Sequence, residues 1–159
     1  MSQELLPVLL KHPFAADLEP EHTKRLAEMA RQVQFQTGQI IFHEGDDYSV
    51  FYLLGKGLVA LELEMPGNVL LRIQTLHGGD ELDWSAVLKN AGKHFQARAL
   101  TEVTALAFEG DALRASFEAD PRFGLAFMMK LMGVVSERLR ATRVQLVDMV
   151  SPEAKRAGT

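Results

Sequence analysis

Between Gln32 and Phe108, the chain divides into short extended segments separated by turns that contain glycine, and this pattern most constrains the fold. The first segment, Gln32 to Gln36, alternates strictly between polar and apolar residues, as a half-buried strand does. Further segments follow at 39–43, 49–54, 58–64 and 69–75, and two more fit between His94 and Phe108. Short strands at this spacing predict a β-barrel or a β-sandwich.

Helical patterns flank the strands on both sides, so the fold class is α+β. Ser2 to Leu10 has the pattern of a short amphipathic helix, and a clearer helix opens at Pro20, where proline suits the first turn. Asp111 to Glu118 predicts another short helix. From Pro121 to Val150, only two glycines interrupt a long helical pattern. We expect one domain over residues 1–150, followed by a disordered tail at 151–159.

The long helix predicted at 121–150 carries two apolar stripes. One repeats at alternating steps of four and three residues, the a/d seam of a coiled coil. Its members are Met128, Met132, Val135, Leu139, Thr142, Leu146 and Met149. The second stripe, Phe127, Leu131 and Val134, would face the strands. Two stripes need two surfaces, which favours a homodimer through this helix over a long helix that packs only on its own domain.

Composition excludes several classes of protein. The chain has a net charge of -4 and no cysteine, which argues against a dedicated nucleic-acid binder and excludes thiolate nucleophiles and disulfides. No apolar run approaches the length of a membrane span, and the N-terminus lacks a secretory signal, so we expect no membrane association and a cytoplasmic location. The five histidines show no metal-ligand spacing, which leaves a small metalloenzyme as the weakest hypothesis.

The segment from Gly78 to Ala99 contains the candidate site. Two glycines precede Asp83, a candidate N-cap for a helix of one or two turns, and free N–H groups at such a helix can bind an anion. Lys93 and His94 follow, where a cation could face a bound phosphate. The competing interpretation is an ordinary connection between strands with a solvated lysine.

Several segments together resemble the cyclic nucleotide-binding domain of the catabolite activator protein superfamily. They are Phe35-Gln36-Thr37-Gly38-Gln39-Ile40-Ile41-Phe42 with Gly45, Phe51-Tyr52-Leu53-Leu54 with Gly57, Gly79-Asp80, and Ala97-Arg98-Ala99-Leu100-Thr101. The resemblance implies an antiparallel β-roll, a jelly-roll-like double sheet, flanked by N-terminal helices and a long C-terminal dimerisation helix. It also implies a bacterial regulator in signal transduction, not an enzyme, whose ligand is a cyclic nucleotide (cAMP or cGMP) or another small anion; no further cofactor is implied.

In this superfamily, a Gly-Glu pair and a short helix precede an arginine, which binds the phosphate while the glutamate binds the ribose. Counted from Gly79-Asp80, the Gly-Glu positions fall on Asp83 and Trp84, and the arginine position falls on Lys93. An alternative register places the glutamate of the pattern on Glu81, followed by Leu82. As a whole, the resemblance implies twelve ligand-binding residues. They are Gly79, Asp80, Leu82, Asp83, Trp84, Ser85, Ala86, Lys93, His94, Phe95, Thr142 and Arg143.

These positions depart from the superfamily pattern in ways that weaken phosphate binding. Tryptophan accepts no hydrogen bond, lysine lacks the bidentate fork of arginine, and Asp83 would repel a phosphate unless it caps the helix or pairs with Lys93. Trp84-Ser85 and His94-Phe95 instead resemble stand-alone bacterial members that carry Gly-Trp-Ser and Arg-Trp-His-Phe.

Thr142 and Arg143 occupy the helix positions that contact the base in the activator protein. The Thr142 hydroxyl would bond either a ligand or the backbone carbonyl one turn back.

Two functions remain open. The first is a small-ligand-sensing regulatory domain that signals through its dimer or an unknown protein partner. The second is a ligand-free protein-interaction module in which Trp84 fills the old pocket. We expect no direct DNA binding, because the residues after Val150 are too few for a helix-turn-helix domain.

Overall fold

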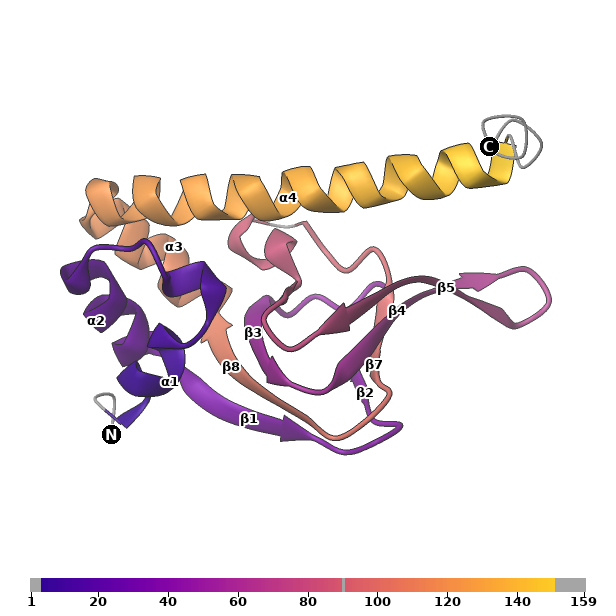
Figure 1. The fold of residues 1–159 in the computed structure, drawn as a ribbon, viewed down its shortest axis with the longest axis horizontal. Coiled ribbons are helices and arrows are strands. Elements are labelled where there is room, and N and C mark those ends of the chain that lie inside the picture. The colour runs from indigo at the N-terminus through magenta and orange to yellow at the C-terminus, as the bar shows by residue number, and fades with distance from the viewer. Residues whose placement is uncertain (1–3, 90, 151–159) are drawn as a thin grey trace, which may run out of the picture.

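Two antiparallel sheets of four strands each form the centre of the fold in this computed structural model, which describes residues 4–89 and 91–150 (Figure 1). The strand orders are β1-β8-β3-β6 and β2-β7-β4-β5. The strands are β1 (Arg31–Phe35), β2 (Ile40–Phe42), β3 (Val50–Lys56), β4 (Leu58–Met65), β5 (Val69–His77), β6 (Glu81–Leu82), β7 (Gln96–Ala99) and β8 (Val103–Glu109). The predicted α+β class and the jelly-roll-like double sheet are confirmed.

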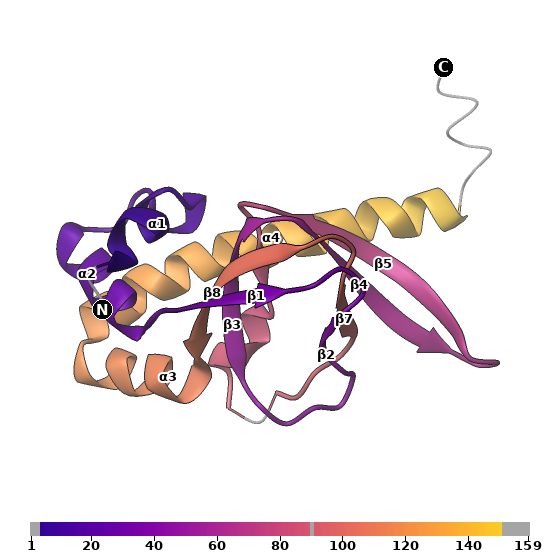
Figure 2. The same cartoon turned by 90° about the horizontal axis from the view of Figure 1, so that it is seen from below.

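Helices cover one end of the double sheet, and the longest runs along the whole molecule (Figures 1 and 2). They are α1 (Leu6–Leu10), α2 (Pro20–Met29), α3 (Gly110–Ala119) and α4 (Pro121–Val150), with the 3₁₀ helices η2 (Pro13–Ala15) and η3 (Trp84–Val87). Pro20 occupies the first turn of α2, as expected. The start of the predicted N-terminal helix and the predicted tail at 151–159 lie outside the described residues.

Strand β3 separates two hydrophobic cores, because successive side chains of a strand point to opposite faces. Phe51 and Leu53 pack among the helices, whereas Tyr52 and Leu54 pack between the sheets. All four are almost fully buried. Burial on both faces explains why the sequence here is continuously apolar rather than alternating.

Helix α4 buries one stripe and leaves most of the other exposed. Phe127 and Leu131 lie in the hydrophobic core among the helices, the core that also contains Phe51, and Val134 packs against it. The stripe predicted to face the domain therefore does so. On the predicted seam, by contrast, Met132 is 65% exposed and Leu146 is 59% exposed in the single chain. The dimer itself stays a prediction, taken up below.

The outer half of the β4–β5 hairpin departs from the expected strand pattern. Alternation predicts that Val69 and Leu71 point inward, yet both are exposed. The reason is tertiary: β7 pairs with β4 only between Val59 and Glu62, so the outer half of the hairpin extends beyond the double sheet (Figure 1).

His12 ties the N-terminal segment to the candidate site. Its Nδ1 accepts a hydrogen bond from the Phe14 N–H at 3.1 Å, and its Nε2 lies 3.2 Å from the Asp80 carbonyl oxygen, to which it donates. The ring is buried, and burial lowers its pKa below the usual 6.5, although the Asp80 and Leu54 backbone contacts oppose this. A neutral ring suits both contacts, since a protonated Nδ1 could not accept.

We therefore expect the free energy of unfolding to fall as the pH drops below about 6.5. The unfolded chain binds a proton at His12 more readily than the folded chain, so His12 favours folding above this pH and acidification removes that contribution. His12→Gln should cost about 1–2 kcal/mol at pH 7.5 and flatten the acid side of the profile. Urea unfolding between pH 5 and 8 measures both effects. His43→Gln, which changes an exposed histidine, should follow the wild-type profile; equal slopes for all three proteins would contradict this assignment.

Candidate functional site

A pocket of about 380 Å³ opens between the second sheet, the β6–η3 segment and α4. We call it the α4 pocket. Its volume falls within the range of about 300–1,000 Å³ that is usual for small-molecule sites. Its walls are mainly apolar, with a few polar groups. The lining residues are Leu61, Ile73, Gln74, Leu76, Glu81, Asp83, Trp84, Phe95, Val135, Arg138, Leu139 and Thr142.

The α4 pocket gathers only part of the predicted ligand-binding set. Asp83, Trp84, Phe95 and Thr142 line it. Gly79 and Asp80 instead line an adjoining hollow of about 540 Å³ between the N-terminal segment and α4. The others lie elsewhere: Leu82, Ser85, Ala86 and Lys93 are buried outside the lining, and His94 and Arg143 are exposed on the surface.

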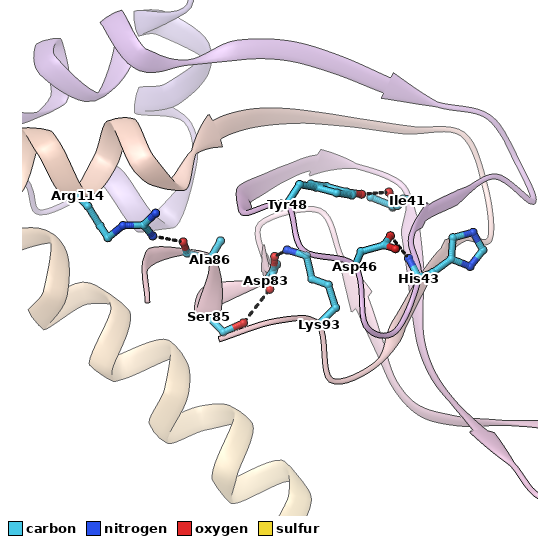
Figure 3. A network of polar contacts seen from close by, with 9 residues as sticks. All are labelled: Ile41, His43, Asp46, Tyr48, Asp83, Ser85, Ala86, Lys93 and Arg114. Carbon is cyan, nitrogen blue, oxygen red and sulfur yellow. Dashed lines mark hydrogen bonds and ion pairs between the residues drawn. The ribbon is translucent and has the colours of Figure 1, made fainter. Parts of the chain in front are cut away.

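Lys93 points inward and forms an ion pair with Asp83 (Figure 3). Each side chain is only 2% exposed. Ser85 donates a hydrogen bond from its hydroxyl to the second Asp83 oxygen at 2.9 Å. Of the two roles that the sequence left open for Asp83, capping the helix or pairing with Lys93, the structure shows the pair with Lys93.

The remaining surroundings of Lys93 are aromatic and acidic. Its Nζ lies 4.9 Å from the centre of the Phe42 ring and 5.2 Å from that of Tyr48, within range of cation–π attraction. The backbone N–H of Gly45 donates to the Lys93 carbonyl at 2.9 Å, which joins the loop between β2 and β3 to the backbone of Lys93. Burial lowers the pKa of Lys93 to about 8, while the charge of Asp46 acts in the opposite direction. The contact with Asp83 favours the charged ammonium.

The short helix predicted after Asp83 is a single 3₁₀ turn, η3. Asp83 stands at its N-cap with a φ of 64°, an uncommon backbone region for a residue other than glycine, and its side chain does not cap the helix. The Asp83 carbonyl accepts from the Ala86 N–H at 3.0 Å. At the other end, Arg114 of α3 donates to the Ala86 carbonyl at 3.0 Å (Figure 3). Because the Asp83 carboxylate does not cap η3, it is available to pair with Lys93.

Arg138 of α4 joins the helix to β6, and sequence reasoning missed it. Its Nη2 donates to the Glu81 carbonyl at 2.5 Å, and the two residues line both the α4 pocket and the adjoining hollow. Burial raises the pKa of the Glu81 carboxyl, which the charge of Arg138 opposes, and burial lowers the pKa of Arg138. The available signal was spacing: Arg138 precedes Thr142 by four residues and so shares its helix face.

Thr142 resolves one alternative from the sequence. Its hydroxyl donates to the Arg138 carbonyl at 3.0 Å, one turn back along α4. This is the backbone contact, not a free hydroxyl aimed at a ligand. Thr142 nevertheless lines the α4 pocket, as do Val135 and Leu139, and all three belong to the predicted seam.

Other kinds of site find little support in the described part of the chain. Within residues 4–89 and 91–150, no group of three His, Cys, Asp or Glu side chains is placed to hold a metal ion. In the same ranges, no helix combines the length and the apolar character needed to cross a membrane.

Comparison with known proteins gives a consistent family. Residues 32–120 match the family model for the cyclic nucleotide-binding domain. A curated relative from Mycobacterium tuberculosis, a CRP-like cAMP-activated global transcriptional regulator, is 24% identical over 143 residues, which are 90% of this chain and 62% of the regulator. The chain thus spans about three fifths of the length of the curated relatives it matches.

Solved structures show the same fold. A candidate cyclic nucleotide-binding protein from Geobacter metallireducens is 27% identical, with a TM-score of 0.73, and the match covers 87% of this chain and 98% of that one. The regulatory subunit of a cAMP-independent protein kinase A from Trypanosoma cruzi, bound to guanosine, is 20% identical with a TM-score of 0.66, covering 81% of this chain and 44% of the subunit.

Proposed function

Because this chain belongs to the cyclic nucleotide-binding domain family, we propose that it is a regulatory domain that senses a small ligand in the α4 pocket and signals through a homodimer. The observation that carries the proposal is that three residues belong both to the pocket wall and to the predicted dimer seam. Val135, Leu139 and Thr142 line the pocket and also lie on the a/d seam of α4.

These three shared residues connect ligand binding to the packing of the two α4 helices in the dimer. A ligand in the α4 pocket would contact the same three residues that pack against the partner helix. A ligand shifts an equilibrium only by its difference in affinity for the two states, and such a difference arises where the ligand touches the surface that changes. Regulation by this route needs no catalytic group, in keeping with curated relatives that are transcriptional regulators.

Trp84 provides the test of ligand sensing, because it is the single tryptophan of the chain and lines the pocket. A library of nucleotides, nucleosides and other small metabolites should contain a compound that changes Trp84 fluorescence. At one hundred times its dissociation constant, that compound should stabilise the fold by about 2.7 kcal/mol, a rise of roughly 5–11 °C in melting temperature. A library in which nothing changes either signal would refute the proposal.

Leu146→Glu is expected to dissociate the dimer. The seam residue Leu146 is 59% exposed in the single chain, and a carboxylate there would be buried against its partner copy. Sedimentation at micromolar concentration should give twice the mass of 17.7 kDa for the wild type and 17.7 kDa for the variant. Val144→Glu introduces the same charge off the seam and should remain dimeric. A wild-type chain that sediments as a monomer would remove the dimer from the proposal.

A ligand-free interaction module is the second candidate, and the Asp83–Lys93 pair favours it because the cation is already neutralised. Trp84→Ala separates the two functions. If the indole fills a disused pocket, the change should cost about 3–5 kcal/mol of stability, as a core deletion does. Trp84 is only partly buried at the pocket wall, so we expect a smaller loss together with impaired ligand binding. Urea unfolding and calorimetric titration measure the two effects.

A further inference from the structure

We infer that the α4 pocket takes an electrically neutral ligand, a nucleoside rather than a cyclic nucleotide, because Asp83 already neutralises the lysine that a phosphate would need. The inference rests on the proposed function and names the class of ligand for that site. Its basis is the arrangement of charge in and behind the pocket.

The first step is the ion pair of Lys93. The ammonium group sits behind the pocket wall, paired with Asp83 and enclosed by the Phe42 and Tyr48 rings. Lys93 does not line the α4 pocket, whereas Asp83 does. A phosphate could reach this cation only by displacing a carboxylate that Ser85 also holds at 2.9 Å. The displaced carboxylate would then lie beside the phosphate, where like charges repel.

The second step counts the remaining charges on the pocket wall. Glu81 and Asp83 contribute carboxyl groups, and Arg138 contributes the single cation among the lining residues. That guanidinium donates to the Glu81 carbonyl, and the charges of Asp80 and Glu81 act on it. Asp46 lies behind the wall near Lys93 and adds another acid. Acidic groups therefore outnumber the single cation on this wall, and an anion that is desolvated beside carboxylates binds poorly.

The third step is what a neutral molecule would meet. Trp84 and Phe95 provide aromatic surface, and planar rings pack favourably against such side chains. Gln74 and Glu81 provide acceptors for hydroxyl groups, which a ribose supplies in a neighbouring pair. A planar base joined to an uncharged sugar fits this combination, and the cavity of about 380 Å³ is suited to a molecule of that size.

Titration of the wild-type protein with adenosine, guanosine, cAMP and cGMP, followed by Trp84 fluorescence and calorimetry, tests the inference. At least one nucleoside should bind at least tenfold more tightly than its cyclic nucleotide. A cyclic nucleotide that binds equally well or better would overturn the inference and leave the proposed function standing. If none of the four binds, the inference also fails, and the metabolite library above decides the proposed function separately.

A charge variant tests the cause of the selectivity. Asp83→Asn removes the counter-ion of Lys93, so the preference for nucleoside over cyclic nucleotide should fall at least tenfold. Asp111→Asn, which makes the same change in net charge at an exposed position on α3, should keep the wild-type preference. Because Asp83→Asn leaves a buried lysine unpaired and could fail to fold, the double variant Asp83→Asn with Lys93→Met serves as a second test. Without either charge, it should still prefer the nucleoside, and a preference for the cyclic nucleotide would overturn the inference.

Discussion

Replacing Lys93 with methionine is expected to lower the free energy of unfolding by about 3–5 kcal/mol. Methionine keeps most of the volume of the lysine chain but removes the charge, which leaves the Asp83 carboxylate 2% exposed with the Ser85 hydroxyl as its side-chain donor. An unpaired buried charge costs more than the ion pair itself contributes. For a chain of 159 residues, the loss corresponds to a fall of roughly 6–20 °C in melting temperature.

A double-mutant cycle isolates this effect. Adding Asp83→Asn to Lys93→Met removes both charges and should recover much of the lost stability, since replacing a whole buried pair is often nearly neutral. Lys89→Met, which changes an exposed lysine four residues earlier, should stay within about 0.5 kcal/mol of the wild type. If Lys93→Met proves as mild as Lys89→Met, the ion pair does not exist in solution, and the inference of a neutral ligand loses its basis.

Phe127→Ala is expected to destabilise the protein by a similar amount, about 3–5 kcal/mol. Phe127 is fully buried, and its ring centre lies 5.0 Å from that of Phe14 in η2, 5.6 Å from that of Phe51 in β3 and 4.9 Å from that of Phe117 in α3. Truncation would leave a cavity where α4 meets three other elements. The energetic cost combines lost burial with the void that remains.

Urea denaturation at several protein concentrations measures this loss and separates folding from dimer formation. Met129→Ala is the matched control, because Met129 is two positions away on α4 and 67% exposed. It should change the free energy of unfolding by less than about 0.5 kcal/mol. Comparable losses for the two variants would mean that α4 is not anchored through Phe127.

Periodicity predicted the elements well where local sequence decides them. The pattern over 121–150 matches α4 residue for residue, and the alternation at 32–36 matches β1 to within one residue at each end. Strand β6 was not anticipated, because Glu81 and Leu82 are extended only through pairing with β3. The inward orientation expected for Val69 and Leu71 was wrong, because alternation cannot tell how far the opposing sheet extends.

The candidate site, too, was predictable from the sequence only in part. The sequence by itself determined the segment: the glycines before Asp83, the short helix at Trp84 and the basic residue ten positions after Asp83 all follow from local patterns and from resemblance. Only the tertiary structure decided that Lys93 turns inward to Asp83 and that Arg138 meets Glu81 across 57 residues of chain. The physical reason is that secondary structure depends on neighbours in the chain, whereas the partner of a buried charge depends on which elements pack around it.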